Sequence, residues 1–125
     1  MNVISLNDTC VTRHQTVGEA ICKALQAEAL KLGFGQSALP DIDWRRLKFS
    51  VGQDPADGKD CLTGEWRNPA GHRIGQIQFN VDGSFFAEHD IVLAHPSDKR
   101  WFVEAIEAWG RDGHITTEPR FLAAI

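Results

Sequence analysis

The 125-residue sequence has no apolar run of the length that a transmembrane helix requires, and no basic segment followed by an apolar stretch marks a secretory signal. Its three cysteines are scattered, and no CxxC motif joins any two of them. The odd number and the spacing argue against a disulfide framework and favour reduced thiols. We therefore expect a cytoplasmic protein that does not associate with a membrane.

Motifs that carry common enzyme chemistry are also missing. The sequence has no P-loop, no HxH or HExxH metal signature, and no nucleophile elbow. A loose match to the dinucleotide fingerprint GxGxxA covers residues 33–38, but it follows a predicted helix instead of opening one, so it indicates a helix end. The sequence favours a protein that is not an enzyme, and it assigns no cofactor and no metal.

The composition is that of one globular domain over residues 1–125. The chain is 42% hydrophobic and 24% charged, which excludes a disordered or fibrous protein. Its formal net charge is −4, which argues against a general nucleic-acid surface. The most basic segment, Trp44–Lys48, is interpreted as the start of a strand whose charges alternate between two faces.

Helical periodicity predicts a helix near the N-terminus. Thr16 and Glu19 have the spacing of a capping box, in which two side chains satisfy exposed backbone N–H groups at a helix start. Apolar residues then recur along one helical face, namely Val17, Ile21, Ala24, Leu25, Ala29 and Leu32. Gly33 follows them and suits a left-handed C-cap, so we expect a helix over residues 17–32.

Four antiparallel strands are predicted next. Alternating apolar and polar residues indicate strands over 45–51, 61–67, a run ending at 79, and 85–93. Turn residues separate the last three strands at Asn68–Gly71 and Asn80–Gly83. In the second turn, a three-residue loop pairs Phe79 with Phe85, whereas a two-residue loop would bring a carboxylate into the apolar row.

A second helix is predicted after this meander. Ser97 suits a helix N-cap, and Gly110 suits a helix end. An apolar stripe at helical spacing lies between them, formed by Phe102, Ala105, Ile106 and Trp109. We therefore expect a two-layer α+β domain with an N-terminal helix, a four-stranded antiparallel meander and a C-terminal helix, and short extra strands at 1–6 and 114–118 are left open.

One apolar feature conflicts with this pattern. The turn at Asn68–Gly71 pairs Trp66 with Ile74 and places both, with Phe86, on the face that the next hairpin marks as polar. A bulge at Gly75 would return Trp66 and Ile74 to the core. Without a bulge, Trp66, Ile74 and Phe86 form an exposed patch beside Glu88 and Asp90, as is typical of a partner site.

Two functional hypotheses follow. The first is an adaptor or chaperone-like module that binds a protein partner, or a second copy of itself, through the patch of Trp66, Ile74, Phe86, Glu88 and Asp90. The alternative is a small-molecule or metal-binding domain, with enzymatic activity as an option, that uses His89, His95 or the Glu88 and Asp90 pair. Strand geometry opposes the alternative, because adjacent strand residues point to opposite faces and His89 is therefore interpreted as a core histidine.

Overall fold

A computed structural model of the protein describes residues 12–33, 42–53, 58, 60–94, 101–111 and 113–123. These residues form a helix, a short 3-10 turn and six strands. In chain order the elements are α2 (Thr12–Lys31), η3 (Trp44–Arg46), β1 (Lys48–Gln53), β2 (Asp60–Arg67), β3 (Arg73–Asn80), β4 (Ser84–Ala94), β5 (Trp101–Arg111) and β6 (His114–Ala123).

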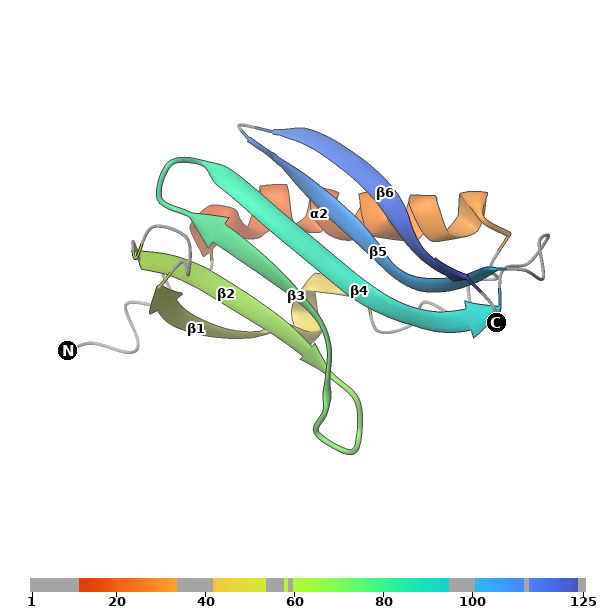
Figure 1. Ribbon diagram of the computed structural model, residues 1–125. Helices are drawn as coiled ribbons and strands as arrows, with labels where there is room; N and C mark the ends of the chain where they lie inside the picture. Colours follow the sequence, from red (N-terminus) through yellow and green to blue (C-terminus); the bar gives the residue numbers. More distant parts are fainter. Residues whose placement is uncertain are drawn as a thin grey trace.

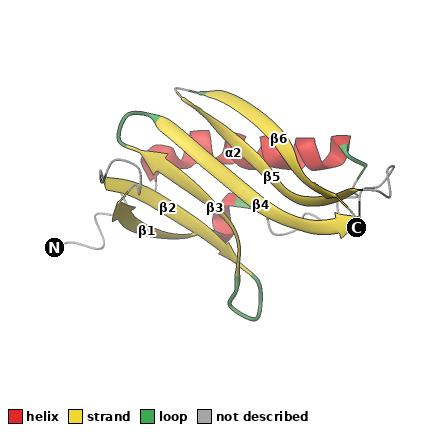
Figure 2. Ribbon diagram, viewed as in Figure 1, coloured by secondary structure: helices red, strands yellow, loops and turns green. Residues whose placement is uncertain are grey.

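The six strands form one antiparallel sheet in which each strand pairs with its neighbours in the chain, in the order β1-β2-β3-β4-β5-β6. The helix α2 crosses one face of this sheet and contacts β4, β5 and β6 (Figure 1). The short turn η3 lies on the same side as α2, whereas no described element covers the other face (Figure 2). We call this uncovered side the open face.

The core lies between the sheet and α2 because one side of each is apolar. Ile21, Leu25 and Ala29 repeat every four residues along α2 and are completely buried, as the helical stripe predicts. On the sheet, burial alternates along β3, and Ile77 and Phe79 point towards the helix. Burial of these side chains supplies the main free energy that holds the helix to the sheet.

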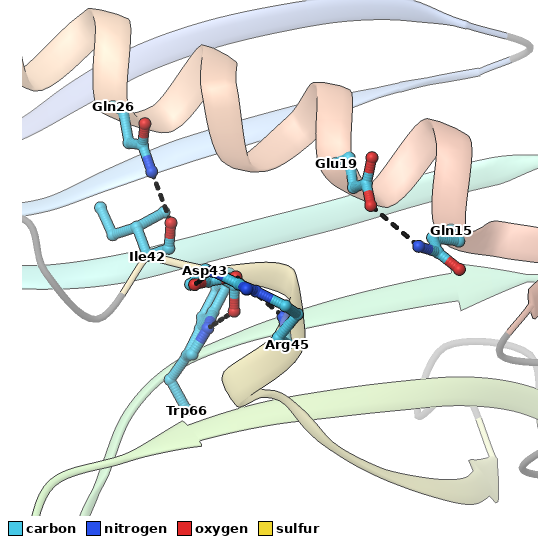
Figure 3. A network of polar contacts seen from close by, with 7 residues as sticks. All are labelled: Gln15, Glu19, Gln26, Ile42, Asp43, Arg45 and Trp66. Carbon is cyan, nitrogen blue, oxygen red and sulfur yellow. Dashed lines mark hydrogen bonds and ion pairs between the residues drawn. The ribbon is translucent and has the colours of Figure 1, made fainter.

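The segment before β1 is attached to both layers by polar contacts (Figure 3). Gln26 of α2 donates its side-chain N–H to the carbonyl of Ile42 at 2.5 Å, and the Trp66 indole of β2 donates to the carbonyl of Asp43 at 2.9 Å. Asp43 also caps η3 by accepting the backbone N–H of Arg45 at 2.9 Å. The strand predicted over 45–51 therefore begins later, at Lys48, because η3 and its cap occupy the residues before it.

The predicted four-stranded meander with a C-terminal helix is wrong. Residues 101–111 form strand β5, and β6 adds a sixth strand that runs past the predicted 114–118. A register shift between Val103 and Ala105 explains the apparent helical stripe, because an extra residue in a strand breaks the two-residue alternation. Ala105 and Ile106 follow the shift on opposite faces of the strand, and both are completely buried, so two adjacent residues imitate the buried face of a helix. The predicted cap at Ser97 and the strand at 1–6 lie outside the described residues.

The start of the first helix also differs from the prediction. The helix begins at Thr12, so Thr16 lies within it and does not cap it. Glu19 accepts a hydrogen bond from the Gln15 side chain at 2.9 Å, one helical turn earlier, instead of closing a capping box (Figure 3). The predicted end is confirmed, because Gly33 has φ +92° and its N–H bonds to the carbonyl of Leu30 at 3.0 Å.

Both predicted turns are confirmed. Gly71 and Gly83 have φ values of +87° and +90°, and each donates its N–H to the residue three positions earlier. The three-residue loop pairs Phe79 with Phe85, as the apolar alternation requires. The hairpin between β3 and β4 therefore has the predicted register, which fixes the side chains that reach the open face.

Candidate functional site

A bulge in β3 removes Trp66 from the predicted surface patch. Arg67 pairs with Arg73, whereas Trp66 pairs with Gly75, so Ile74 is the extra residue between the two pairs. Trp66 is only 1% exposed and Ile74 packs against the core. The patch of Trp66, Ile74, Phe86, Glu88 and Asp90 is therefore not one surface, because its two members from β2 and β3 face the helix.

The other three members of that patch lie on the open face. Phe86, Glu88 and Asp90 alternate along β4 with the buried residues Ala87 and His89. The acidic pair of Glu88 and Asp90 is therefore separated from His89 by the sheet.

The His89 ring lies in the core, in the position that strand alternation predicts. Its Nδ1 atom lies 3.0 Å from the carbonyl oxygen of Asp90, and its ring meets Trp66 edge-on with centroids 5.5 Å apart. The ring is 6% exposed, so a solvent-borne ligand has little access to it. His95, the second residue of the alternative ligand site, lies outside the described residues.

The open face contains an aromatic pair that the sequence pattern did not identify. Phe86 of β4 and Trp109 of β5 are direct cross-strand neighbours, and residues in this position have Cβ atoms only about 5 Å apart. Phe86 is half-buried, and Trp109 is 36% exposed. Large aromatic side chains in such a position supply much of the energy of protein–protein contacts.

A row of glutamates runs beside this pair. Glu88, Glu107 and Glu118 are directly paired on β4, β5 and β6, so three carboxylates stand side by side across adjacent strands. Like charges at such short separations repel one another and destabilise the sheet. The chain therefore places repulsive charge next to an exposed aromatic pair, a combination that the fold alone does not require.

Arg120 reduces part of that repulsion. Its guanidinium lies 2.5 Å from a carboxylate oxygen of Glu107 and 3.7 Å from one of Glu88. A depression of about 390 Å³ adjoins these groups at the β6 end of the sheet and is lined by Glu107, Glu118, Pro119, Arg120 and Phe121. Charged side chains thus lie beside the aromatic pair, and a hollow adjoins their row at β6.

A second depression lies at the start of α2. It has a volume of about 350 Å³ and is lined in part by His14, Phe79 and Ser84. The His14 ring stacks on Phe79 with centroids 4.5 Å apart. Burial, with a smaller contribution from nearby Arg13, lowers the pKa of His14 from its usual value. The neutral imidazole therefore fits this apolar position better than the charged form.

Among the described residues, no group of three His, Cys, Asp or Glu side chains is arranged to hold a metal ion. Within the same part of the chain, no helix has the length and apolar character to cross a bilayer.

Sequence reasoning missed Trp109, Glu107 and Glu118 because it placed residues 98–109 in a helix and stopped the last strand at 118. A usable signal was present in residues 105–111, where Glu107, Trp109 and Arg111 alternate with smaller or apolar residues. That two-residue period predicts a strand with one polar face.

Comparison of the chain with protein-family models, curated proteins and solved structures finds no match.

Proposed function

We propose that this protein is a protein-interaction module that binds its partner through the open face of its sheet. The observation that carries the proposal is the direct pairing of Phe86 with Trp109 on a face that no described helix or loop covers. Binding would bury both rings and release the water that contacts them.

The charges beside the aromatic pair support a protein partner. Glu88, Glu107 and Glu118 form a negative row, and a partner that supplies cationic side chains would relieve the repulsion within it. The same row excludes acidic polymers, because each carboxylate would meet another negative charge. The partner surface is therefore expected to combine an apolar centre with Lys or Arg beside it.

Site-specific photo-crosslinking in the native host tests this proposal. One variant carries p-benzoylphenylalanine at Phe86, and the control carries it at Leu30, which is 45% exposed on α2 and lies away from the open face. The Phe86 position is expected to crosslink to one defined protein, identified by mass spectrometry, and the adduct is expected to disappear when Trp109→Thr is added. Absence of any protein adduct from Phe86, or identical adducts from both positions, would contradict the proposal.

A further inference from the structure

The open face carries carboxylates on one side of its aromatic row and an arginine on the other side. On one side lie Glu88 and Glu107, directly paired across β4 and β5. On the other side, Ser84 and Arg111 are paired on the same two strands, with Phe86 and Trp109 between the two rows. Strand β6 repeats the pattern, because Glu118 pairs with Glu107 and His114 pairs with Arg111. A row of glutamates and a row that contains Arg111 and His114 thus flank a central aromatic row.

Such a pattern is complementary to itself under one rotation. Consider a two-fold axis that lies between two packed sheets and runs parallel to the Phe86–Trp109 row. It stacks each strand of one copy on the same strand of the other copy, with the two strands running in opposite directions. The row of glutamates of one copy then meets the row of Arg111 and His114 of the other, and the aromatic rows meet each other. A two-fold axis parallel to the strands would instead place Glu107 over Glu107, and the resulting repulsion excludes it.

We propose that the partner on the open face is a second copy of this chain, related by the two-fold axis along the Phe86–Trp109 row. This inference rests on the proposed function and names its partner. Glu107 of each copy faces Arg111 of the other, Glu118 faces His114, and Trp109 packs against Trp109. The contact is isologous, so the pair of Glu107 and Arg111 occurs twice.

The dimensions and the exposure of these groups suit this arrangement. Two sheets that pack face to face are about 10 Å apart, a gap that side chains from both sheets fill together. The Arg111 side chain is 60% exposed and already bonds one carboxylate, with its Nη2 atom 2.8 Å from Asp82 Oδ2. Arginine carries several N–H donors in a planar fork, so Arg111 can donate to Glu107 of the second copy while it keeps its bond to Asp82.

Association through the β6 edge is less favourable than association through the open face. Strand β6 is an outer strand of the sheet, and Pro119, opposite Ile106, has no N–H to donate to an added strand. Proline is one of the devices by which edge strands avoid pairing with another chain. The open face therefore offers a contact between two copies that this edge does not.

Sedimentation analysis of charge-reversed variants tests the inference. Wild type is expected to show a concentration-dependent dimer. Glu107→Arg alone and Arg111→Glu alone are each expected to raise the dissociation constant about tenfold or more, because like charges then meet twice. An equimolar mixture of the two variants is expected to dimerise again, because both cross-contacts join opposite charges. Lys23→Glu on the exposed side of α2 is the control and should leave dimerisation unchanged.

The mixing experiment separates this inference from the proposed function. A monomeric wild type, or two folded variants whose mixture stays monomeric, would overturn the second-copy inference. Photo-crosslinking of Phe86 to a different protein would leave the proposed function standing, whereas no crosslink at all would remove both. If Glu107→Arg unfolds the chain because Arg120 loses its bond to Glu107, Glu118→Arg and His114→Glu form a second pair at exposed positions with the same expected rescue.

Discussion

The ring of Trp44 covers Gly18 of α2 so closely that a Cβ atom at residue 18 would lie 2.0 Å from the Trp44 Cζ3 atom. Glycine at this position lets η3 pack directly onto the helix backbone. Gly18→Ala is therefore expected to destabilise the protein by about 1–3 kcal/mol through overpacking, although alanine favours a helix by about 1 kcal/mol. Urea unfolding measures the difference.

The matched control for this prediction is Gly52→Ala in β1. A Cβ at Gly52 would meet nothing within 4 Å, so the same added methyl group should leave the midpoint of unfolding almost unchanged. Equal stability of Gly18→Ala and wild type would show that the Trp44 ring does not pack directly on Gly18.

Replacement of two tryptophans tests which face each one occupies. Trp66→Phe removes the indole donor to the Asp43 carbonyl and leaves a space in the core, at an expected cost of about 1–3 kcal/mol. Trp109→Phe on the open face should change the stability of the monomer by less than about 0.5 kcal/mol. Chemical unfolding at low protein concentration measures the free energy of unfolding of both variants. A larger loss for Trp109→Phe than for Trp66→Phe would contradict the assignment of the two tryptophans to their faces.

Thiol chemistry provides a third test. Cys22 is buried in α2, and burial, followed by the nearby Asp43 and Glu19 carboxylates, raises its pKa to about 12. At pH 8 the side chain is therefore a protonated, inaccessible thiol. Iodoacetamide followed by peptide mapping is expected to leave Cys22 unmodified in the native protein and to alkylate it in denaturant. Rapid alkylation of native Cys22 would show that α2 does not bury this residue.

The pH dependence of stability should change when His14 is removed. Its pKa is lowered in the folded state, so the unfolded chain binds more protons as the pH falls below the usual value of 6.5. The stabilising effect of neutral His14 is complete above that value and is lost as the pH falls through the folded-state pKa. Wild type is thus expected to lose more stability than His14→Gln between about pH 7 and pH 5. Parallel curves for both proteins would contradict a half-buried ring stacked on Phe79.

The sequence predicts local features of this fold well. Gly33, Gly71 and Gly83 were assigned to a helix end and two turns from their neighbours alone, because left-handed backbone conformations favour glycine strongly. The pairing of Phe79 with Phe85 follows from strand alternation and the loop length, both of which are local properties.

The C-terminal half could not be predicted in the same way. Strand β5 is held by pairing with β4 and β6, and a single sequence contains no direct record of those partners. Ala105, Ile106 and Trp109 also have a helix-like spacing in the sequence, although the strand places Ile106 on the helix side and Ala105 and Trp109 in register with open-face residues of β4. Because Trp109 and Glu107 belong to this strand, the candidate surface was predicted only in the part that β4 supplies.

Hydroxyl-radical footprinting of the tryptophans tests most directly whether the open face is the binding surface. In dilute, monomeric protein, Trp109 is expected to be oxidised readily while buried Trp66 is not. When the protein is bound to its partner or self-associated, oxidation of Trp109 is expected to fall and that of Trp66 to stay low. Unchanged oxidation of Trp109 in the bound state would contradict the account, because the aromatic pair on the open face would then remain in water.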